Sequence, residues 1–212
     1  MSIAVFDVGG TFIKYAEMHQ DIIITQGKVA TPQDSQENFL NVIKDVLNDL
    51  SSHIEGIAFS LPGVIDVDRK YVYAGGSLRY NDHTYIKDWE AVLQLPIELE
   101  NDARCAVIAE LSRGNMKGID KGVVLTFGTG IGGGIIINGE IYKGSHLIGG
   151  EVSVLLTKDI RKHGIKAAWG AQCGSVHLIK AIADAKGISC ENGKEVFSWV
   201  ERYDEESLKI FE

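Results

Sequence analysis

The chain has 212 residues, a formal net charge of −8 and ordinary shares of hydrophobic (45%) and charged (24%) residues. That length allows one large or two small domains with a buried core. The acidic balance argues against a protein that binds nucleic acid or acidic membranes. No apolar run approaches the roughly 20 residues of a membrane span, and no basic-then-apolar leader opens the chain. We therefore expect a soluble, cytoplasmic protein.

Cysteine usage agrees with a reducing compartment. Cys105, Cys173 and Cys190 lie far apart and form no C-x-x-C pair. Such spacing provides neither a disulfide framework nor a zinc site.

The N-terminal half predicts an α/β arrangement. Its first three strands are joined by connections too short for crossover helices, so we expect them to be antiparallel. Asp34 and Glu37 resemble a capping box that starts a helix with Phe39 and Ile43 on its buried face. Residues 72–89 show no periodic pattern and are expected to be irregular. The expected elements are strands at 2–10, 11–18, 21–30, 54–60 and 95–100, and helices after Asp34 and over 101–111.

The stretch RGNMKGIDKG (113–122) interrupts the pattern and is the best domain boundary. We expect an N-terminal lobe over residues 1–115 and an incomplete second lobe over residues 116–212. Helices of the second lobe are expected at 172–186 and 194–202.

The end of the chain predicts one more helix. Asp204 is a suitable N-cap, and Leu208 and Phe211 then share a helical face. The chain stops one residue later, with that face in need of a partner. We therefore expect the chain to be truncated at its C-terminus.

Residues 126–140, TFGTGIGGGIIINGE, contain a literal G-x-G-x-x-G made by Gly128, Gly130 and Gly133. A dinucleotide-binding fingerprint needs a helix directly after its glycines. Here three isoleucines and an Asn-Gly pair follow, which is a strong hairpin signal. The run is therefore expected to form a strand–glycine turn–strand unit, whose backbone N–H groups could hold phosphate.

The same layout occurs at residues 6–12, FDVGGTF, where a buried strand with Asp7 runs into a Gly9-Gly10 turn, Thr11 and a second strand. A plain Gly-Gly hairpin explains either turn equally well. Two such turns, each opening a separate lobe, predict two grips on one polyphosphate. Asp7 is placed to hold Mg²⁺ through water, because Mg²⁺ keeps much of its hydration.

Five motifs, in order, resemble the ROK family of sugar kinases and repressors, a branch of the actin-like ATPase superfamily. They are DVGGT (7–11), LPGVID (61–66), ENDA (100–103), GTGIGGGIIINGEIYKG (128–144) and GGE (149–151). The matches cover most of the chain from residue 3 to about residue 187, and as an ordered set they are highly specific. The resemblance implies a two-lobe α/β fold of the actin-like (ribonuclease H-like) type, with ATP and Mg²⁺ as cofactors.

The resemblance also implies roles for the motif residues. Asp102 of ENDA would be the catalytic base, although Asn and Asp are also the preferred helix N-caps. A carboxylate there can accept the proton of a sugar hydroxyl that attacks the γ-phosphoryl group. The alternatives are a solvated loop carboxylate for Glu151 and a plain Pro-Gly turn for Gly63. Sugar contacts are expected from Gly63, Asn101, Asp102 and Glu151, and phosphate contacts from Asp7, Gly9, Gly10, Thr11, Gly128, Thr129, Gly130 and Gly132.

The sequence departs from the family's pattern in three places. The family's G-E-x-G-H reads GEVSV here, so Ser153 and Val154 replace a glycine and a sugar-binding histidine. The zinc cluster is absent, as in the zinc-less branch, and Cys173 is then expected to be a small buried residue, with His177 on a helix and not a ligand. The family's later adenine-side glycines and closing helix are not in this sequence.

These features predict ATP- and Mg²⁺-dependent phosphorylation of a hexose or β-glucoside at the 6-hydroxyl. The changes at Ser153 and Val154 would open room near the anomeric carbon and favour a glucoside or disaccharide over free glucose. The alternatives are a non-catalytic sugar sensor related to the repressors, or an inactive fragment. Because the fold starts at Ser2 and the charge is acidic, DNA binding is not expected. The expected partners are the sugar, ATP and a second copy of the chain in a homodimer.

Overall fold

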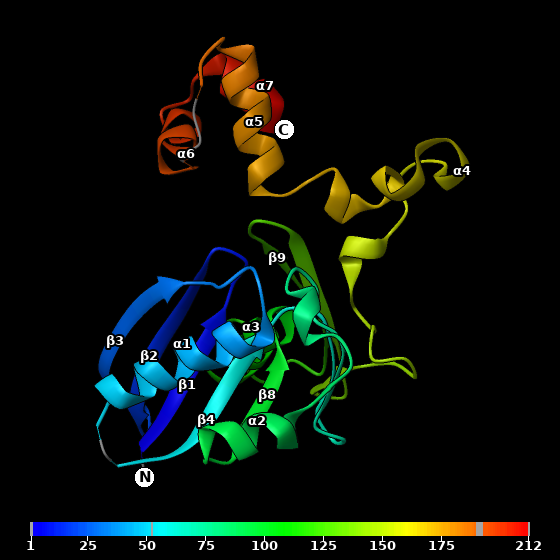
Figure 1. The fold of residues 1–212 in the computed structure, drawn as a ribbon. Helices are drawn as coiled ribbons and strands as arrows, with labels where there is room; N and C mark the ends of the chain where they lie inside the picture. Colours follow the sequence, from blue (N-terminus) through cyan, green and yellow to red (C-terminus); the bar gives the residue numbers. More distant parts are fainter. Residues whose placement is uncertain (1, 52, 190–192, 212) are drawn as a thin grey trace. The chain divides into compact units, whose positions relative to one another are not determined.

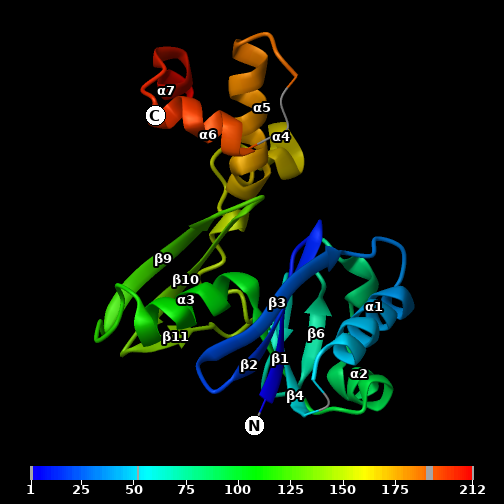
Figure 2. The same ribbon diagram turned by 90° about the vertical axis from the view of Figure 1, so that its left-hand side faces the viewer.

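The computed structural model describes residues 2–51, 53–189 and 193–211, without the side chains of Glu206 and Phe211. The chain divides into two compact units, whose elements are drawn in Figure 1 and Figure 2. Unit 1 runs to Ser112 and also contains the short segment Gly144–Ile148. Unit 2 contains Arg113–Lys143 and the residues from Gly149 onward.

Unit 1 is built on a five-stranded sheet. Its strands are β1 (Ser2–Val8), β2 (Phe12–His19), β3 (Ile22–Ala30), β4 (Ile54–Leu61) and β8 (Ile97–Asn101), in the order β3-β2-β1-β4-β8. The first three strands are antiparallel, as their short connections predict, whereas β4 runs parallel to both β1 and β8. Along β1, Ala4, Phe6 and Val8 are buried and Asp7 is exposed, which is the alternation of a strand with one face on the core.

The helices of unit 1 are α1 (Gln36–Asp49), α2 (Ile86–Leu93) and α3 (Asp102–Arg113). Figure 2 shows α1 and α2 on one side of the sheet and α3 on the other. An aromatic cluster joins the first two helices to the sheet: Trp89 of α2 lies 5.3 Å from Phe39 of α1 and 5.6 Å from Phe59 of β4, between ring centroids. Such large buried rings dominate the packing energy of a small core.

The N-terminus of α1 differs from the predicted capping box by one residue. Ser35 is the N-cap, and its hydroxyl accepts a hydrogen bond from the backbone N–H of Asn38 at 3.2 Å. Asp34 instead accepts from the side-chain amide of Asn38 at 3.1 Å. Ser35 has the extended backbone that an N-cap requires, so the shorter side chain takes that role.

The prediction that residues 72–89 are irregular is wrong. This region and the residues before it form a small antiparallel sheet of β5 (Val64–Asp66), β6 (Tyr71–Ala74) and β7 (Thr84–Tyr85), and α2 follows directly. No side chain caps α2 at Tyr85, and Gln94 ends it in the left-handed conformation usually left to glycine. The helix therefore lacks both of its usual boundary signals in the sequence.

Unit 2 begins with a three-stranded antiparallel sheet of β9 (Lys121–Phe127), β10 (Ile131–Ile137) and β11 (Glu140–Tyr142). A three-residue glycine turn joins β9 to β10, so the predicted strand–turn–strand unit is confirmed. The predicted hairpin between β10 and β11 is also confirmed, because Asn138 (φ 56°) and Gly139 (φ 76°) both have the positive φ of a type I′ turn.

The later part of unit 2 is helical. The helices are α4 (Ile160–His163), α5 (Ser175–Ala185), α6 (Gly193–Glu201) and α7 (Glu205–Phe211). Three 3₁₀ turns of the described part of unit 2 lie at Val152–Val154, Gly164–Ala167 and Trp169–Ala171, and unit 1 contains another at Arg79–Asn81. Asp204 caps α7 as predicted, with Oδ1 accepting from the N–H of Ser207 at 2.9 Å. The predicted shared face of Leu208 and Phe211 involves a side chain outside the described residues, that of Phe211.

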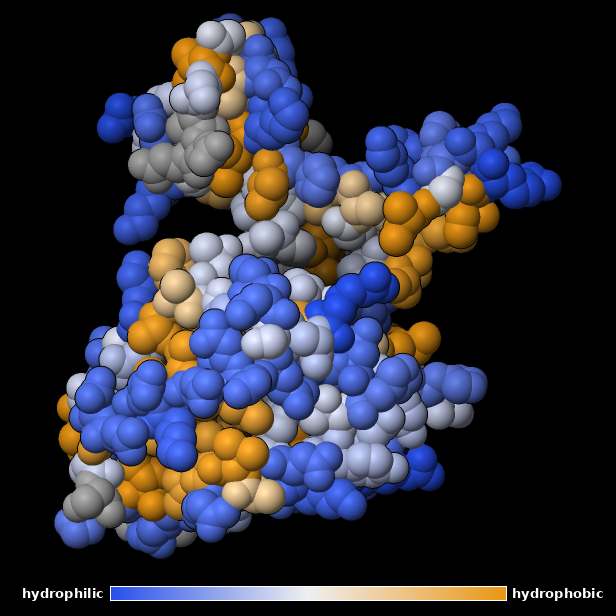
Figure 3. All heavy atoms as spheres, in the orientation of Figure 1, coloured by the Kyte–Doolittle hydropathy of each residue, from blue (hydrophilic) through white to orange (hydrophobic). Residues whose placement is uncertain are grey.

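Hydrophobic side chains are exposed around α4. They are visible as an orange area on that segment in Figure 3, and Ile165 is the most exposed of them at 83%. The others are Leu155, Leu156 and Ile160. Across the described ranges, no helix has both the length and the apolar character needed to cross a bilayer.

Candidate active site

Three parallel strands of unit 1 bring several predicted site residues to one edge of the sheet. In the strand register, Asp7 of β1 lies opposite Ser60 of β4, and Leu61 of β4 lies opposite Asn101 of β8. Asp102 follows β8 directly and opens α3. Ligands of open α/β sheets bind outside the carboxyl ends of the strands, and this is such an edge.

The carboxylate of Asp102 is oriented by two N–H donors. Its Oδ1 accepts hydrogen bonds from the Asn101 side-chain amide at 3.0 Å and from the backbone N–H of Ala103 at 2.8 Å. Asn101 itself caps α3, because its Oδ1 accepts from the N–H of Arg104 at 3.1 Å. The capping role therefore falls to Asn101, and Asp102 is exposed at the junction of strand and helix.

Asn101 also connects this junction to the Pro-Gly turn after β4. It is 6% exposed, and its Nδ2 donates to the carbonyl oxygen of Gly63 at 3.0 Å. Gly63 has a φ of +109°, and a Cβ there would lie 1.9 Å from the carbonyl oxygen of Ala74, so only glycine fits. The structure thus places Gly63 and Asn101 beside Asp102. Their direct contact with a sugar stays a prediction.

Asp7 lies at the end of β1, next to the first glycine turn. Its Oδ1 accepts a hydrogen bond from the Ser60 hydroxyl at 2.9 Å, and its Oδ2 lies 3.5 Å from the Lys14 ammonium. The side chain is 52% exposed. The carboxylate is therefore both positioned by a neighbouring strand and open to solvent.

The first glycine turn is held through its carbonyl groups. The Thr31 hydroxyl donates to the carbonyl oxygen of Gly9, and the Gln33 amide donates to that of Gly10, each at 2.7 Å. Within the described residues no hydrogen bond uses the backbone N–H of Gly10 or Thr11. Those two donors are available to a ligand.

The structure adds Ser60 and Cys105 to this edge, and neither is among the site residues that the sequence predicts. Burial raises the pKa of the Cys105 thiol to about 11, while a hydrogen bond with Ser60 opposes the rise. The negative charges of Glu100, Asp102 and Asp7 raise it as well. The thiol is therefore within electrostatic reach of both predicted functional aspartates. Its position three residues after Asp102 is the signal that could have revealed it, because such residues are neighbours on a helix surface.

Unit 2 carries the second glycine turn. The N–H of Gly128 donates to the carbonyl oxygen of Gly130 at 2.9 Å, and the N–H of Ser175 at the start of α5 donates to the carbonyl oxygen of Gly128 at 2.7 Å. Gly174, the N-cap of α5, has a φ of +127°, and a Cβ there would lie 2.7 Å from the Thr129 carbonyl oxygen. The N-terminus of α5 is thus seated on the turn, and a helix N-terminus favours anions.

Packing does not explain three of the predicted phosphate-binding glycines. A Cβ on Gly130 would meet nothing within 4 Å, and one on Gly128 or Gly10 would meet its nearest atom at 4.0 Å or 3.5 Å, which is ordinary contact. None of the three has a positive φ. Bare backbone with open space in front of it suits the close approach of a ligand. Gly132, by contrast, belongs to β10, opposite Thr126.

Glu151 lies in unit 2, where it caps the 3₁₀ turn Val152–Val154. Its Oε1 accepts from the N–H of Ser153 at 3.2 Å. Ser153 packs closely against Gly170, where a Cβ would lie 2.7 Å from the Cβ of Ser153. Val154 is exposed. Glu151 therefore shares one short turn with both residues at which the sequence departs from its expected pattern.

The prediction that Cys173 is buried is wrong. Cys173 and His177 are both exposed. Cys173 lies in the link between the turn Trp169–Ala171 and α5, so it is on no buried helical face. Among the side chains that the structure describes, no cluster of three or more His, Cys, Asp or Glu residues could hold a metal ion.

The sequence matches the model of the ROK family over residues 3–204. The chain belongs to the ROK family. Its predicted α/β fold of the actin-like type is confirmed by the solved structures of ROK kinases that it matches.

Several curated relatives of this ROK chain are named as sugar kinases. A β-glucoside kinase of Listeria monocytogenes is 37% identical over 161 residues, which are 74% of this chain and 54% of the relative. A β-glucoside kinase of Klebsiella pneumoniae is 36% identical over 160 residues (74% and 53%), and a glucokinase of Halalkalibacterium halodurans is 30% identical over 192 residues (86% and 56%). The chain spans about half the length of the curated relatives it matches.

Solved structures match nearly all of the ROK chain. The Lmo2764 protein of Listeria monocytogenes superposes with a TM-score of 0.85 at 30% identity, over 100% of this chain and 74% of its own. A ROK family protein from Streptococcus pneumoniae, in complex with sucrose, has a TM-score of 0.77 at 26% identity (99% and 71%). A ROK family glucokinase from Streptomyces griseus, in complex with glucose and AMPPNP, has a TM-score of 0.81 (100% and 74%); at 23% identity it shows the fold alone.

Proposed function

We propose that this chain provides the sugar- and phosphate-binding elements of a kinase. The kinase would transfer the γ-phosphoryl group of ATP to the 6-hydroxyl of a β-glucoside, and less efficiently to that of a free hexose. The observation that carries the proposal is the Asp102 carboxylate, which two N–H donors orient at the carboxyl edge of the sheet. The names of the relatives, two β-glucoside kinases and a glucokinase, support the substrate class.

In this proposal Asp102 accepts the proton of the attacking hydroxyl. The donors Asn101 and Ala103 fix the carboxylate through Oδ1, so a sugar hydroxyl meets a base whose direction is already set. Asn101 also binds the carbonyl of Gly63, which keeps the Pro-Gly turn at a constant position relative to the base. A positioned general base contributes about 10²–10⁴-fold to the rate.

The two glycine turns would bind the phosphate groups of ATP. In unit 1 the available N–H donors are those of Gly10 and Thr11. In unit 2 the open backbone at Gly128 and Gly130 lies at the positive end of α5. Backbone donors of this kind need no reorganisation when charge moves between the phosphoryl oxygens.

Asp7 fits a Mg²⁺ ion. It offers a half-exposed carboxylate oxygen, and Mg²⁺ characteristically takes one or two carboxylates and keeps several waters. Lys14, 3.5 Å away, is itself 73% exposed, and an exposed ion pair of this kind is worth little and gives way to a stronger cation. Bound beside Asp7, the ion would neutralise charge on the β- and γ-phosphates.

Two observations support a glucoside over free glucose. Ser153 and Val154 stand where the ROK pattern has a glycine and a sugar-binding histidine, and both lie on the turn that Glu151 caps. A ROK family protein of Streptococcus pneumoniae was solved with sucrose, a disaccharide. A site without the histidine would leave the anomeric carbon uncovered, as a glucoside requires.

The test is sugar-dependent ADP release with Mg-ATP, on glucose, N-acetylmannosamine, mannose, fructose and cellobiose. Asp102→Asn removes the base and keeps the side-chain shape, and Asp45→Asn on the exposed face of α1 is the matched control. We expect turnover on cellobiose to exceed that on glucose, and Asp102→Asn to lower kcat by about 10²–10⁴-fold. Phosphorus NMR of the product should show a 6-phosphate.

Each part of the proposal has its own contrary result. Full activity of Asp102→Asn would rule out the base, and a large preference for free glucose would rule out the glucoside. A product phosphorylated elsewhere would rule out the 6-hydroxyl. Sugar binding without turnover of any sugar would favour the non-catalytic sensor instead.

A further inference from the structure

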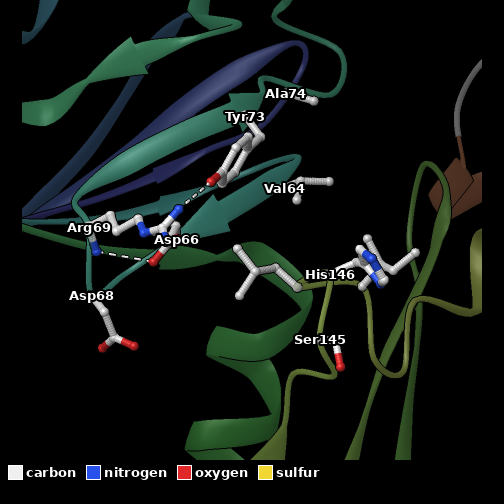
Figure 4. Close-up of a pocket in the computed structure, with 10 residues that line it drawn as sticks. Val64, Asp66, Asp68, Arg69, Tyr73, Ala74, Ser145 and His146 are labelled. Carbon is white, nitrogen blue, oxygen red and sulfur yellow. Dashed lines mark hydrogen bonds and ion pairs between the residues drawn. The ribbon is translucent and has the colours of Figure 1, made fainter.

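Unit 1 contains a cavity that none of the roles above uses. Its volume is about 680 Å³, within the range of about 300–1,000 Å³ that is usual for small-molecule sites. One wall is formed by β5, β6 and the turn between them, and the other by the segment Ser145–Ile148, as Figure 4 shows. Both walls belong to unit 1.

The cavity begins one residue away from the Pro-Gly turn. Val64, which lines it, directly follows Gly63, and Ala74, which also lines it, brings its carbonyl oxygen against Gly63. The carbonyl of Gly63 accepts from the Asn101 amide, and the same amide donates to Asp102. A continuous series of direct contacts therefore joins the edge of the cavity to the proposed base.

Helix α3, which begins at Asp102, also contacts the wall of the cavity that is formed by Ser145–Ile148. Arg104, two residues further along α3, is buried, and its guanidinium donates to the carbonyl oxygen of Leu147 and lies 3.5 Å from the carboxylate of Glu100. Buried charge-assisted hydrogen bonds of this kind are strong and directional. The cavity and the base are thus positioned by one element.

The side chains around the cavity suit a neutral polyol. Tyr73 is 37% exposed and packs edge-on against Tyr71, with ring centroids 4.8 Å apart. Its hydroxyl accepts from the Arg69 guanidinium at 3.1 Å, and the Arg69 Nε lies 3.7 Å from an Asp66 oxygen. Figure 4 shows this group on one side and His146 with Ser145 on the other.

That combination argues against an anion and for a sugar. Two carboxylates, those of Asp66 and Asp68, line the cavity together with the single guanidinium of Arg69, so the cavity has no excess of positive charge to attract a free phosphate. The electron-rich face of an aromatic ring packs well against the C–H groups on the face of a pyranose. Imidazole and hydroxyl groups on the opposite wall can both donate to and accept from sugar hydroxyls.

We propose that this cavity is a second sugar subsite, which binds the outer ring of a β-linked disaccharide while its glucosyl ring is presented to Asp102. The proposal rests on the proposed kinase function, because it names where that substrate's aglycone binds.

The test compares cellobiose with glucose by calorimetric binding to the 212-residue chain without nucleotide. Tyr73→Ala removes the stacking ring, and Tyr85→Ala is the control, because Tyr85 belongs to the same aromatic cluster, 4.6 Å from Tyr71, and does not line the cavity. We expect Tyr73→Ala to weaken cellobiose binding about tenfold and to leave glucose binding unchanged. His146 is exposed and lies on the opposite wall, and His146→Ala should also weaken the binding of cellobiose without affecting that of glucose. This second variant keeps the test valid if Tyr73→Ala fails to fold.

The contrary results separate the subsite from the kinase. Unchanged cellobiose binding in both cavity variants, a parallel loss for glucose, or no cellobiose binding by the parent would each overturn the subsite. If any of these results were accompanied by turnover of glucose, the proposed kinase function would be retained. Selective binding of cellobiose without turnover of any sugar would support the subsite and overturn the proposed kinase function.

Discussion

The substitution Gly130→Ala tests why the second glycine turn lacks side chains. The glycine is needed either for the fold or for the binding of a ligand to the backbone. The structure offers a matched partner in the same hairpin, three residues away. A Cβ on Gly130 would have no atom within 4 Å, whereas a Cβ on Gly133 would lie 2.8 Å from the carbonyl oxygen of Val124. Neither glycine has a positive φ, so the two substitutions differ only in the space available.

The two substitutions should therefore have opposite effects on stability. Gly130→Ala introduces no clash and lowers the entropy of the unfolded chain, so its effect should lie between zero and a gain of about 1 kcal/mol. Gly133→Ala forces a strand backbone to move, which costs about 1–3 kcal/mol. For a chain of this size that cost lowers Tm by about 2–12 °C.

Thermal unfolding followed by circular dichroism, together with titration of a fluorescent ATP analogue, measures both properties. We expect the Tm of Gly130→Ala to lie between that of the parent and about 4 °C above it. Its nucleotide affinity should fall about tenfold or more, because the new methyl group occupies the space in front of the phosphate-binding backbone. A Gly130→Ala chain that lost stability like Gly133→Ala and bound nucleotide like the parent would refute the reasoning.

Two further predictions concern titratable groups. Iodoacetamide at neutral pH should label the exposed Cys173 much faster than Cys105, because a pKa of about 11 leaves little of the Cys105 thiol as thiolate. Peptide mass spectrometry distinguishes the two labelled cysteines. Fast labelling of Cys105 would contradict its burial. Hydrogen bonds from Ser51 hold the pKa of Glu17 below its usual range, so this carboxylate stabilises the fold above its unfolded-state pKa of about 4.3 and loses that contribution as the pH falls through its folded pKa. Glu17→Gln should therefore lower Tm at neutral pH by an amount that shrinks in acid, whereas a difference independent of pH would exclude this cause.

Local signals in the sequence were sufficient for the features that neighbouring residues encode. The glycine turn after β9 and the Asn-Gly hairpin after β10 each depend on residues adjacent in the chain, and both are confirmed. The helix that begins at Asp102 is likewise encoded by the Asn-Asp pair before its apolar positions. Helix α2 was missed because its ends carry no such signal. Its place depends on Trp89, which packs against rings far away in the sequence.

The sequence by itself therefore determined the family and the antiparallel start of the sheet, and it named the motif residues that are predicted to form the site. The tertiary structure alone decided which side chains surround those residues. Ser60 meets Asp7 across 53 residues because β1 and β4 pair in parallel in one particular register. The cavity beside Gly63 is lined by residues from 64–74 and 145–148, and Arg104 donates to the carbonyl of Leu147 in its second wall, 43 residues away. Strand order and register are set by packing over the whole unit, and no local pattern of residues carries that information.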